Sequence, residues 1–308
     1  MMKKLLLVII ILCMPASILA RTPTTATGGH DVAFTPHNMA YNTNLALGIT
    51  NGGNMRNYRA ANSGANQICV FCHTPHNATR NAPLWNRNAD PGAQYGAGGY
   101  ALYTSSSTLS NAAKTATLTA KNESILCLSC HDGKTAINVL HSSGYRDPTD
   151  PGTGDVTLQI FGFAPGAVNL GQNLFTGMAG VDVIGATRDS SGKIVDGQAG
   201  YNLTDDHPIG FSYTAAVGSK TTQYVGLATI KSTNPAIRFF GPNQDRLECS
   251  TCHDPHVYYG YLKNATGRVT IDSVTGGSLT STAAQKELTP FLVQSNTGSG
   301  LCLSCHIK

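Results

Sequence analysis

Eight of the nine cysteines fall into four copies of one short pattern, Cys-x-x-Cys-His. The copies are CVFCH at 69–73, CLSCH at 127–131, CSTCH at 249–253 and CLSCH at 302–306. Two thiols at this spacing can each form a thioether with one vinyl group of a haem, and the adjacent histidine then binds the iron. The pattern predicts four covalently attached haem c groups, held by Cys69, Cys72, Cys127, Cys130, Cys249, Cys252, Cys302 and Cys305.

Two other uses of eight cysteines compete with haem attachment. Four disulfides would suit an exported chain, and paired Cys-x-x-Cys units can hold structural zinc. Neither explains why a histidine follows the second cysteine in all four copies. Haem attachment does explain it, and the sequence therefore predicts the proximal iron ligands as His73, His131, His253 and His306.

An internal repeat selects second ligands from the other six histidines. The first half reads GHDVAF, CVFCHTPH and ILCLSCH in order, and the second half reads DHPIGF, CSTCHDPH and GLCLSCH. Each half thus supplies two proximal and two further histidines, and the further ones are His30, His76, His207 and His256. His37 and His141 have no counterparts in the other half, so they are predicted not to bind iron.

Chain reach decides which iron His76 can bind. His76 lies three residues after His73, which is roughly 10 Å of extended chain. This length cannot pass around the edge of a porphyrin to the opposite face, and Pro75 holds the segment extended. His76 is therefore predicted to bind a different iron, and the same argument applies to His256. Such links bring haems close together, as electron hopping requires.

All-histidine ligation also bears on the kind of function. The methionines beyond the leader are Met39, Met55 and Met178, and a methionine ligand would raise the reduction potential. The histidines alone can supply both axial ligands of all four haems. All-histidine ligation implies low-potential, six-coordinate haems. Because six-coordinate iron has no open position for a substrate, the sequence predicts an electron carrier and not an enzyme.

The haem segments resemble a known family. The strings ICVFCHTPHNA, APLWNR, CLSCHDG, DHPIGFSY, CSTCHDPH and LCLSCH resemble multihaem c-type cytochromes with doubled CxxCH motifs. The order and number are most similar to the extracellular tetrahaem cytochromes that polymerise into filaments, the OmcE-like nanowire cytochromes. The resemblance implies bis-histidine haems in a loop-rich fold and long-range electron transfer to acceptors outside the cell. It also implies that a histidine of one subunit completes a haem of the next, with His76 the first candidate and His30 the second.

The elements that must position these groups are expected to be short. Abundant Gly, Asn, Ser and Thr give weak helix propensity and many turns, so the fold class is a multihaem cytochrome c of mostly coil, short helices and a few small β-hairpins. Short helices are predicted within 123–140 and 282–292, and hairpins within 181–197 and 268–279. With little aliphatic core expected, the covalent haems would supply the apolar mass.

The chain is predicted to be exported and divided into halves. Residues 1–20 combine two lysines, a short apolar run and small residues, which is typical of a signal peptide and too short for a comfortable membrane span. The first dihaem half is 21–146, a turn-rich insert with a β-hairpin is 147–205, and the second dihaem half is 206–308. Lys and Arg number 21 against 17 Asp and Glu, with no basic run, which excludes a nucleic-acid footprint.

Three functions remain open from the sequence. The first is an extracellular or cell-surface filament subunit, a homopolymer through head-to-tail contacts that passes electrons to other redox proteins or external acceptors. The second is a soluble periplasmic electron shuttle with all ligands in one chain. The third, a haem enzyme such as a nitrite or hydroxylamine reductase, needs one five-coordinate haem in a polar pocket.

Overall fold

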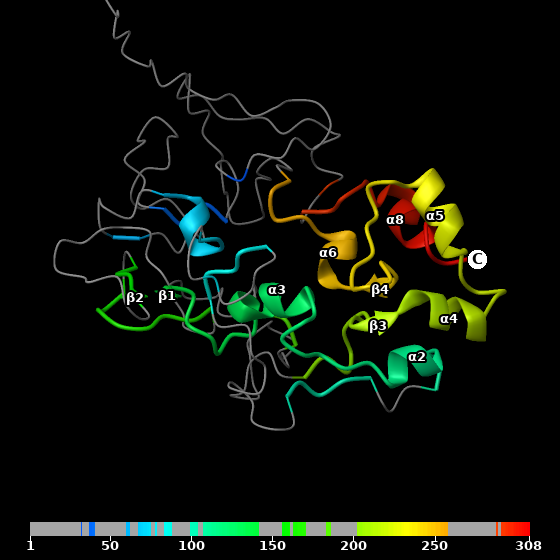
Figure 1. Cartoon of the computed structure of the whole chain (residues 1–308), viewed down its shortest axis with the longest axis horizontal. Coiled ribbons are helices and arrows are strands. Elements are labelled where there is room, and N and C mark those ends of the chain that lie inside the picture. The colour runs from blue at the N-terminus through cyan, green and yellow to red at the C-terminus, as the bar shows by residue number, and fades with distance from the viewer. Residues whose placement is uncertain are drawn as a thin grey trace, which may run out of the picture.

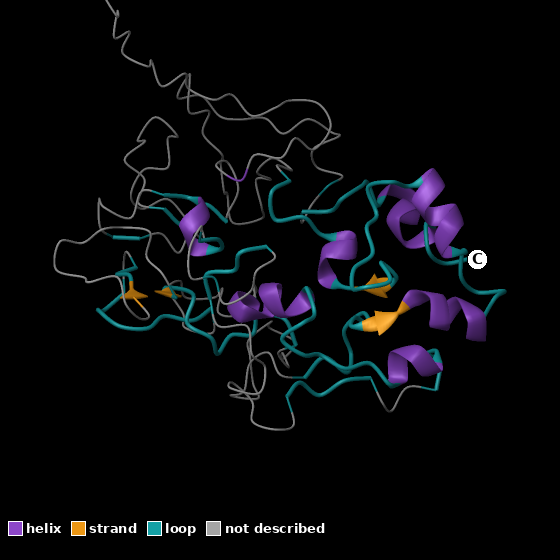
Figure 2. Cartoon of the chain, viewed as in Figure 1, coloured by secondary structure: helices purple, strands orange, loops and turns teal. Residues whose placement is uncertain are grey.

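The structure is a computed structural model that describes residues 32, 37–40, 60–61, 67–74, 78, 83–87, 99–103, 107–141, 156–160, 163–170, 183–185, 202–257, 288 and 291–308. Within these residues the chain is mostly loop, with short helices and two small antiparallel ladders (Figures 1 and 2). This description agrees with the expectation of coil, short helices and small β elements. The elements in chain order are η3 (Cys69–Phe71), α2 (Asn111–Lys114), α3 (Ser124–His131), β1 (Val139–Leu140), β2 (Val156–Thr157), β3 (Phe211–Ser212), α4 (Tyr213–Ser219), α5 (Leu227–Thr233), β4 (Arg246–Leu247), α6 (Cys249–Cys252), η5 (Thr297–Ser299) and α8 (Gly300–Leu303).

Side-chain oxygens begin two of the short helices. Ser110 accepts the Ala113 backbone N–H at 3.2 Å at the start of α2, and Ser212 accepts that of Ala215 at 3.1 Å at the start of α4. A reciprocal capping box of Glu248 and Thr251 starts α6. These caps satisfy N–H groups that a helix start leaves without a partner within the helix, and they locate helices in a chain of weak propensity.

The two ladders join segments that are distant in sequence. β1 pairs antiparallel with β2, with Val139 opposite Thr157. β3 pairs antiparallel with β4, with Phe211 opposite Leu247. β3 continues directly into α4, and β4 leads through Glu248 into α6, so the second ladder joins the starts of these two helices (Figure 1).

One hydrophobic core draws on both predicted halves. Residues of α3, the strand–helix region 203–247 and the C-terminal segment pack together, and α3 lies against α6. Two smaller clusters surround Phe71 and Ile137. The chain therefore has more apolar core of its own than its composition predicts. The buried members of the main cluster are Trp85, Tyr100, Tyr103, Ile125, Leu126, Leu128, Leu203, Ile209, Tyr213, Ile230, Ile237, Phe239, Leu247, Leu292 and Leu301.

The helix predicted within 123–140 is shorter than its sequence pattern allowed. α3 ends at His131 because the chain turns there: Gly133 has φ +68°, and the Asp132 carboxylate accepts the N–H groups of Lys134 and Thr135 at 2.9 and 2.7 Å. The segment then extends into β1. The end of the Cys-x-x-Cys-His unit at 127–131 is thus fixed by a polar turn.

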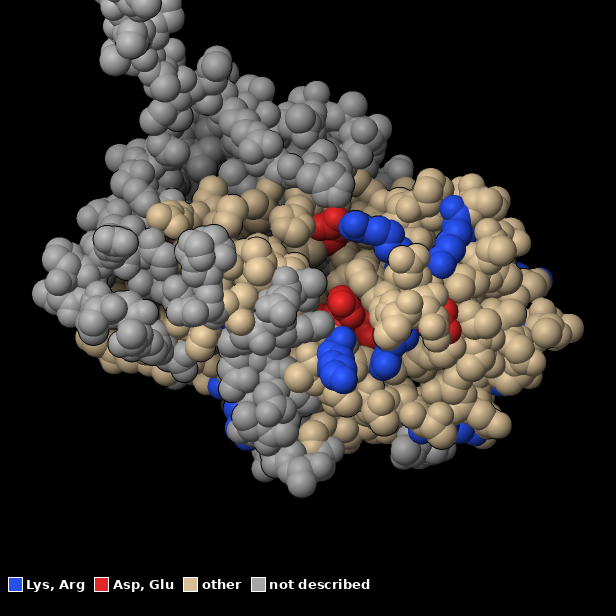
Figure 3. Space-filling model, in the orientation of Figure 1, with Lys and Arg blue, Asp and Glu red and all other residues tan. Residues whose placement is uncertain are grey.

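Several other predictions fall on residues that the structure does not describe. The signal peptide and the 268–279 hairpin lie outside the described residues, and so does nearly all of 181–197 and of the 282–292 helix. Among the described helices, none is long and apolar enough to cross a membrane. On the face seen in Figure 3, the charged side chains of the described residues are few, and acidic groups lie beside basic ones.

Candidate functional site

Each Cys-x-x-Cys-His unit begins on a short helical turn. The backbone N–H of the motif histidine donates to the carbonyl of the first cysteine in three units: His73 to Cys69 at 2.7 Å, His253 to Cys249 at 3.0 Å and His306 to Cys302 at 2.9 Å. The unit at 127–131 lies within α3. Cysteines three residues apart on a helical turn share one face, and both thiols therefore point to the same side, as two thioether bonds to one haem require.

Several of the cysteines are free thiols in environments that favour the protonated form. All eight cysteines of the motifs are unpaired by disulfides. Desolvation raises the pKa of Cys72 and of Cys252 to about 12. Zinc binds thiolates, so a raised thiol pKa disfavours a zinc site, whereas thioether formation adds a protonated thiol across a vinyl group.

The thiols of the second and third motifs meet. A hydrogen bond between Cys127 and Cys249 raises the pKa of Cys127, to which desolvation adds, and lowers the pKa of Cys249, which desolvation opposes. Each of these cysteines is the first of its motif. The contact shows that the attachment segments on α3 and α6 lie directly against each other.

Three pairs of histidine rings lie at one spacing. His73 and His256 have ring centroids 6.2 Å apart, His37 and His131 6.0 Å, and His207 and His306 6.3 Å. Two imidazoles on opposite sides of one metal ion have centroids about 6 Å apart, since each contributes a metal–nitrogen bond of about 2 Å and about 1 Å to the ring centre. Every pair contains one motif histidine and one histidine from elsewhere in the chain.

The ring planes divide the three pairs into two kinds. The rings of His73 and His256 are nearly parallel, with 15° between their planes. The planes are nearly perpendicular in the other two pairs, at 83° for His37 with His131 and 84° for His207 with His306. If each pair holds a low-spin iron, the two orientations predict two different magnetic signatures.

Hydrogen bonds at Nδ1 orient several of these rings. His73 Nδ1 donates to the Pro83 carbonyl at 2.7 Å, and His207 Nδ1 to the Pro208 carbonyl at 3.1 Å. His256 Nδ1 lies 2.9 Å from the carboxylate of Asp254. A proton held at Nδ1 leaves the Nε2 lone pair for a metal, and a carboxylate partner makes the imidazole a stronger ligand.

The ring of His37 lies against that of His131, although the repeat argument predicted that His37 does not bind iron. Desolvation and the nearby His131 together lower the pKa of His37 to about 3, although a hydrogen bond to the Pro255 backbone opposes them. The ring is therefore neutral, which is the form that binds metals. A signal for it was present: Thr-Pro-His occurs at 35–37 as well as at 74–76, and Asp-Pro-His at 254–256.

The remaining candidates are placed as follows. His30 and His76 lie outside the described residues. His253 forms an isolated β-bridge with Leu292, and His141 donates its backbone N–H to the Asn86 carbonyl at 2.9 Å. The structure thus presents three of the four motif histidines with a second histidine opposite, and two of those three partners, His207 and His256, are ones that the repeat selected.

The segment after the first motif joins it to the second. His73 forms a β-bridge with Trp85, and Asn86 donates to the Val70 carbonyl at 2.7 Å. The Trp85 indole N–H donates to the Ser129 hydroxyl of α3 at 3.2 Å. These contacts hold the 69–73 and 127–131 motifs in one rigid arrangement.

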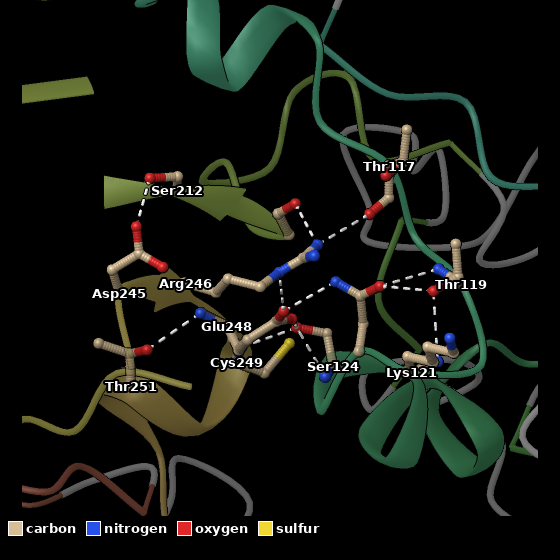
Figure 4. A network of polar contacts seen from close by, with 12 residues as sticks. Thr117, Thr119, Lys121, Ser124, Ser212, Asp245, Arg246, Glu248, Cys249 and Thr251 are labelled. Carbon is tan, nitrogen blue, oxygen red and sulfur yellow. Dashed lines mark hydrogen bonds and ion pairs between the residues drawn. The ribbon is translucent and has the colours of Figure 1, made fainter. Parts of the chain in front are cut away.

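A buried polar network joins the second motif to the third (Figure 4). The Glu248 carboxylate accepts from the Asn122 amide at 2.8 Å and from the Ser124 hydroxyl at 2.5 Å, and it pairs with Arg246 Nε at 3.3 Å. The Ser124 hydroxyl in turn accepts the Cys249 backbone N–H at 2.9 Å. Ser124 begins α3 and Cys249 begins α6, so the network fixes the two helices together.

The donor set fits a haem better than a bare metal ion. Among the described residues, no three or more His, Cys, Asp or Glu side chains gather as a metal site. Paired imidazoles beside paired thiols are instead what a covalently attached haem takes from a protein: two thioethers and two axial nitrogens. No protein-family model and no curated protein matches the chain.

Proposed function

We propose that this chain is a tetrahaem c-type cytochrome that carries electrons through closely spaced bis-histidine haems. The observation that carries the proposal is the three histidine pairs, each with a motif histidine opposite a second imidazole at 6.0–6.3 Å. Haem, when bound, supplies a one-electron redox centre. The residues of the chain anchor it through two thiols, fill both axial positions and exclude other ligands from the iron.

The ring pairs support a second iron ligand for each of three motifs. In this proposal His256 serves the 69–73 motif, His37 the 127–131 motif and His207 the 302–306 motif. The repeat then gives His76 to the 249–253 motif, as the reciprocal of His256. The first and third motifs would exchange ligands and hold two haems close together.

The proposal extends to an extracellular filament built from head-to-tail copies. It is supported by the resemblance of the haem segments and by apolar side chains at one end of the molecule, where Leu303 and Ile307 are exposed beside His306. A contact there lets electrons pass between subunits. The alternative is a soluble periplasmic shuttle, and the pairing of His73 with His256 from the same chain supports it.

Covalent haem is the first expected result. Protein produced with a c-type maturation system is expected to carry four haems per chain, measured by intact mass and by the pyridine haemochrome spectrum. Replacing Cys249 and Cys252 with serine removes both thioether positions of one motif, and the mass is expected to fall to that of three haems. A chain that matures without added haem mass, or that holds stoichiometric zinc, would contradict the cytochrome proposal.

Polymerisation is tested separately. Electron microscopy of native secreted protein is expected to show filaments of uniform diameter, because a head-to-tail contact whose rotation does not close a ring repeats without end. The matched variant Ile307→Asp places a charge in the apolar contact and is expected to shift the material to monomers with the haem content unchanged. Only monomers in the native sample would support the shuttle.

A further inference from the structure

Three of the four Cys-x-x-Cys-His units end in the same kind of isolated antiparallel bridge. The histidine of the unit is one member of the bridge, and a residue with a large side chain is the other. The pairs are His73 with Trp85, His253 with Leu292 and His306 with Tyr224. In every pair the residue after the histidine donates its N–H to the partner segment, and the carbonyl of the second cysteine accepts an N–H in return, with N–O distances of 2.8–2.9 Å. The same arrangement is therefore built three times, from partner segments that differ in sequence.

This bonding pattern sets the two side chains of each bridge against each other. The residues directly opposite are a non-hydrogen-bonded pair, in which side chains lie closer than at the other positions of an antiparallel ladder. The ring centroids of His73 and Trp85 are 5.7 Å apart with 86° between the planes, and those of His306 and Tyr224 are 5.2 Å apart with 56° between the planes. Each bridge thus places a side chain of another segment beside the imidazole of a motif.

The second motif holds its histidine in a different way. His131 is the last residue of α3, and Asp132 after it stays helical, with φ −77° and ψ −5°. His253 at the end of α6 is instead extended, with φ −120° and ψ 139°. The His131 carbonyl accepts the N–H of Ile184 at 2.8 Å, and within the described part of the chain no bridge includes His131. A helix therefore positions this histidine, whereas a bridge positions the other three.

Trp85 is fixed by its own contacts. The residue is buried, and its indole N–H donates to a hydroxyl of α3 at 3.2 Å. The Pro83 carbonyl, which accepts from His73 Nδ1 at 2.7 Å, belongs to the same segment two residues earlier. Packing of Trp85 thus keeps in place both groups of this segment that contact the ring of His73.

Tyr224 is held through the main core. Its ring centroid lies 6.2 Å from that of Tyr213, which is buried in the core. The Tyr213 hydroxyl donates toward the carbonyls of Val225 and Cys305, at 2.8 and 3.0 Å. Val225 follows Tyr224 and Cys305 precedes the motif histidine, so one buried hydroxyl is bonded to both sides of the fourth-motif bridge.

We propose that Trp85, Leu292 and Tyr224 are positioning residues, each of which fixes the rotation of the motif imidazole across its bridge. The inference rests on the tetrahaem function proposed above. An imidazole bound through Nε2 can still turn about the metal–nitrogen axis, and its other neighbours limit that rotation. In the first pair, Trp85 holds the ring of His73 at the rotation that leaves 15° between its plane and that of His256.

The test is electron paramagnetic resonance of the oxidised, loaded protein, with the haem content of each variant measured by intact mass. Trp85→Ala removes the indole, and the ring of His73 can then take a range of angles. The rhombic signal of the nearly parallel pair is expected to lose most of its intensity. Trp85→Phe keeps a flat ring at the same place and is expected to retain that signal. Signals of large anisotropy are expected to remain in both variants.

Tyr224 gives an independent test at a half-buried position. Tyr224→Ala is expected to shift or broaden one signal of large anisotropy, because the nearly perpendicular pair of His207 and His306 loses a constraint on one ring. The rhombic signal is expected to stay as it is. Tyr224→Phe keeps the ring and is expected to match the wild type. These two variants decide the inference if Trp85→Ala does not mature.

Ile230→Ala separates ring positioning from loosening of the core. Ile230 is a fully buried residue of α5 in the same core as Trp85 and Tyr213, and its truncation leaves a cavity there. The variant is expected to unfold at a lower temperature while every resonance signal stays unchanged.

Outcomes that overturn the inference differ from those that overturn the function. An unchanged signal in either alanine variant at position 85 or 224, with four haems bound, would refute the positioning role and leave the cytochrome intact. So would a phenylalanine variant that changes as much as its alanine counterpart, or the same spectral changes in Ile230→Ala. A chain without covalent haem would instead refute the function itself.

Discussion

Removing the imidazole of His256 is expected to convert one haem in four from low spin to high spin. His256 lies 6.2 Å from His73 between ring centroids, and its loss leaves the iron of the first motif with one axial histidine. Magnetic circular dichroism of the oxidised His256→Gly protein is expected to show a high-spin band from about a quarter of the haem. The same haem should then bind carbon monoxide when reduced, which six-coordinate haems resist.

The resonance spectrum identifies which haem has changed. Nearly parallel imidazoles split the iron d orbitals strongly and give an ordinary rhombic low-spin signal, whereas perpendicular imidazoles give a signal of large anisotropy. The 15° pair is therefore expected to lose its rhombic signal in His256→Gly, and the anisotropic signals of the other two pairs remain. Added imidazole should restore the low-spin state if only the ligand is missing. A fully low-spin variant would show that another residue completes the first haem.

Replacing His37 with glycine is expected to have the same effect on the haem of the second motif. The ring of His37 lies 6.0 Å from that of His131, and its lowered pKa keeps it neutral and able to bind iron. Here the lost signal is expected to be one of large anisotropy, because the ring planes lie at 83°. Carbon monoxide binding to about a quarter of the reduced haem measures the open position.

Two matched variants decide between the candidates for this haem. His141→Gly removes a histidine that the repeat also set aside, and it is expected to leave all haems low spin. His30→Gly removes the histidine that the repeat selected. High-spin haem in His30→Gly, together with fully low-spin haem in His37→Gly, would show that the repeat was right and that the ring contact with His131 has another purpose.

The comparison of His30 with His37 shows where the repeat and the tertiary structure favour different residues. The repeat aligned GHDVAF with DHPIGF, and it therefore matched His30 to His207. The structure places His207 opposite His306 but brings His37 opposite His131. His30 and His37 are seven residues apart in the chain. Only the packing of the first half determines which of them lies opposite His131. The shared Pro-His dipeptide at 36–37, 75–76 and 255–256 is the sequence pattern that agrees with the contact of His37 and His131.

The length of α3 likewise depends partly on the local sequence and partly on contacts that the sequence pattern does not show. The apolar pattern of 123–140 predicted a helix, and α3 does form there. Its end at His131 depends on a turn in which Asp132 binds two backbone N–H groups, which no periodicity contains. The core was underestimated for a related reason: residues such as Tyr103 and Tyr213 are scattered in sequence and become a cluster only when the halves pack together.

The sequence by itself predicts haem attachment and the proximal histidines, because two thiols and an imidazole within five residues are positioned by one helical turn. Chain reach also determined that His76 and His256 cannot return to the iron of their own motif. Only the tertiary structure decided which histidine lies opposite which motif, how the ring planes are turned, and that Glu248 is buried between α3 and α6. Those properties depend on contacts between segments tens to hundreds of residues apart, and local spacing does not determine such contacts.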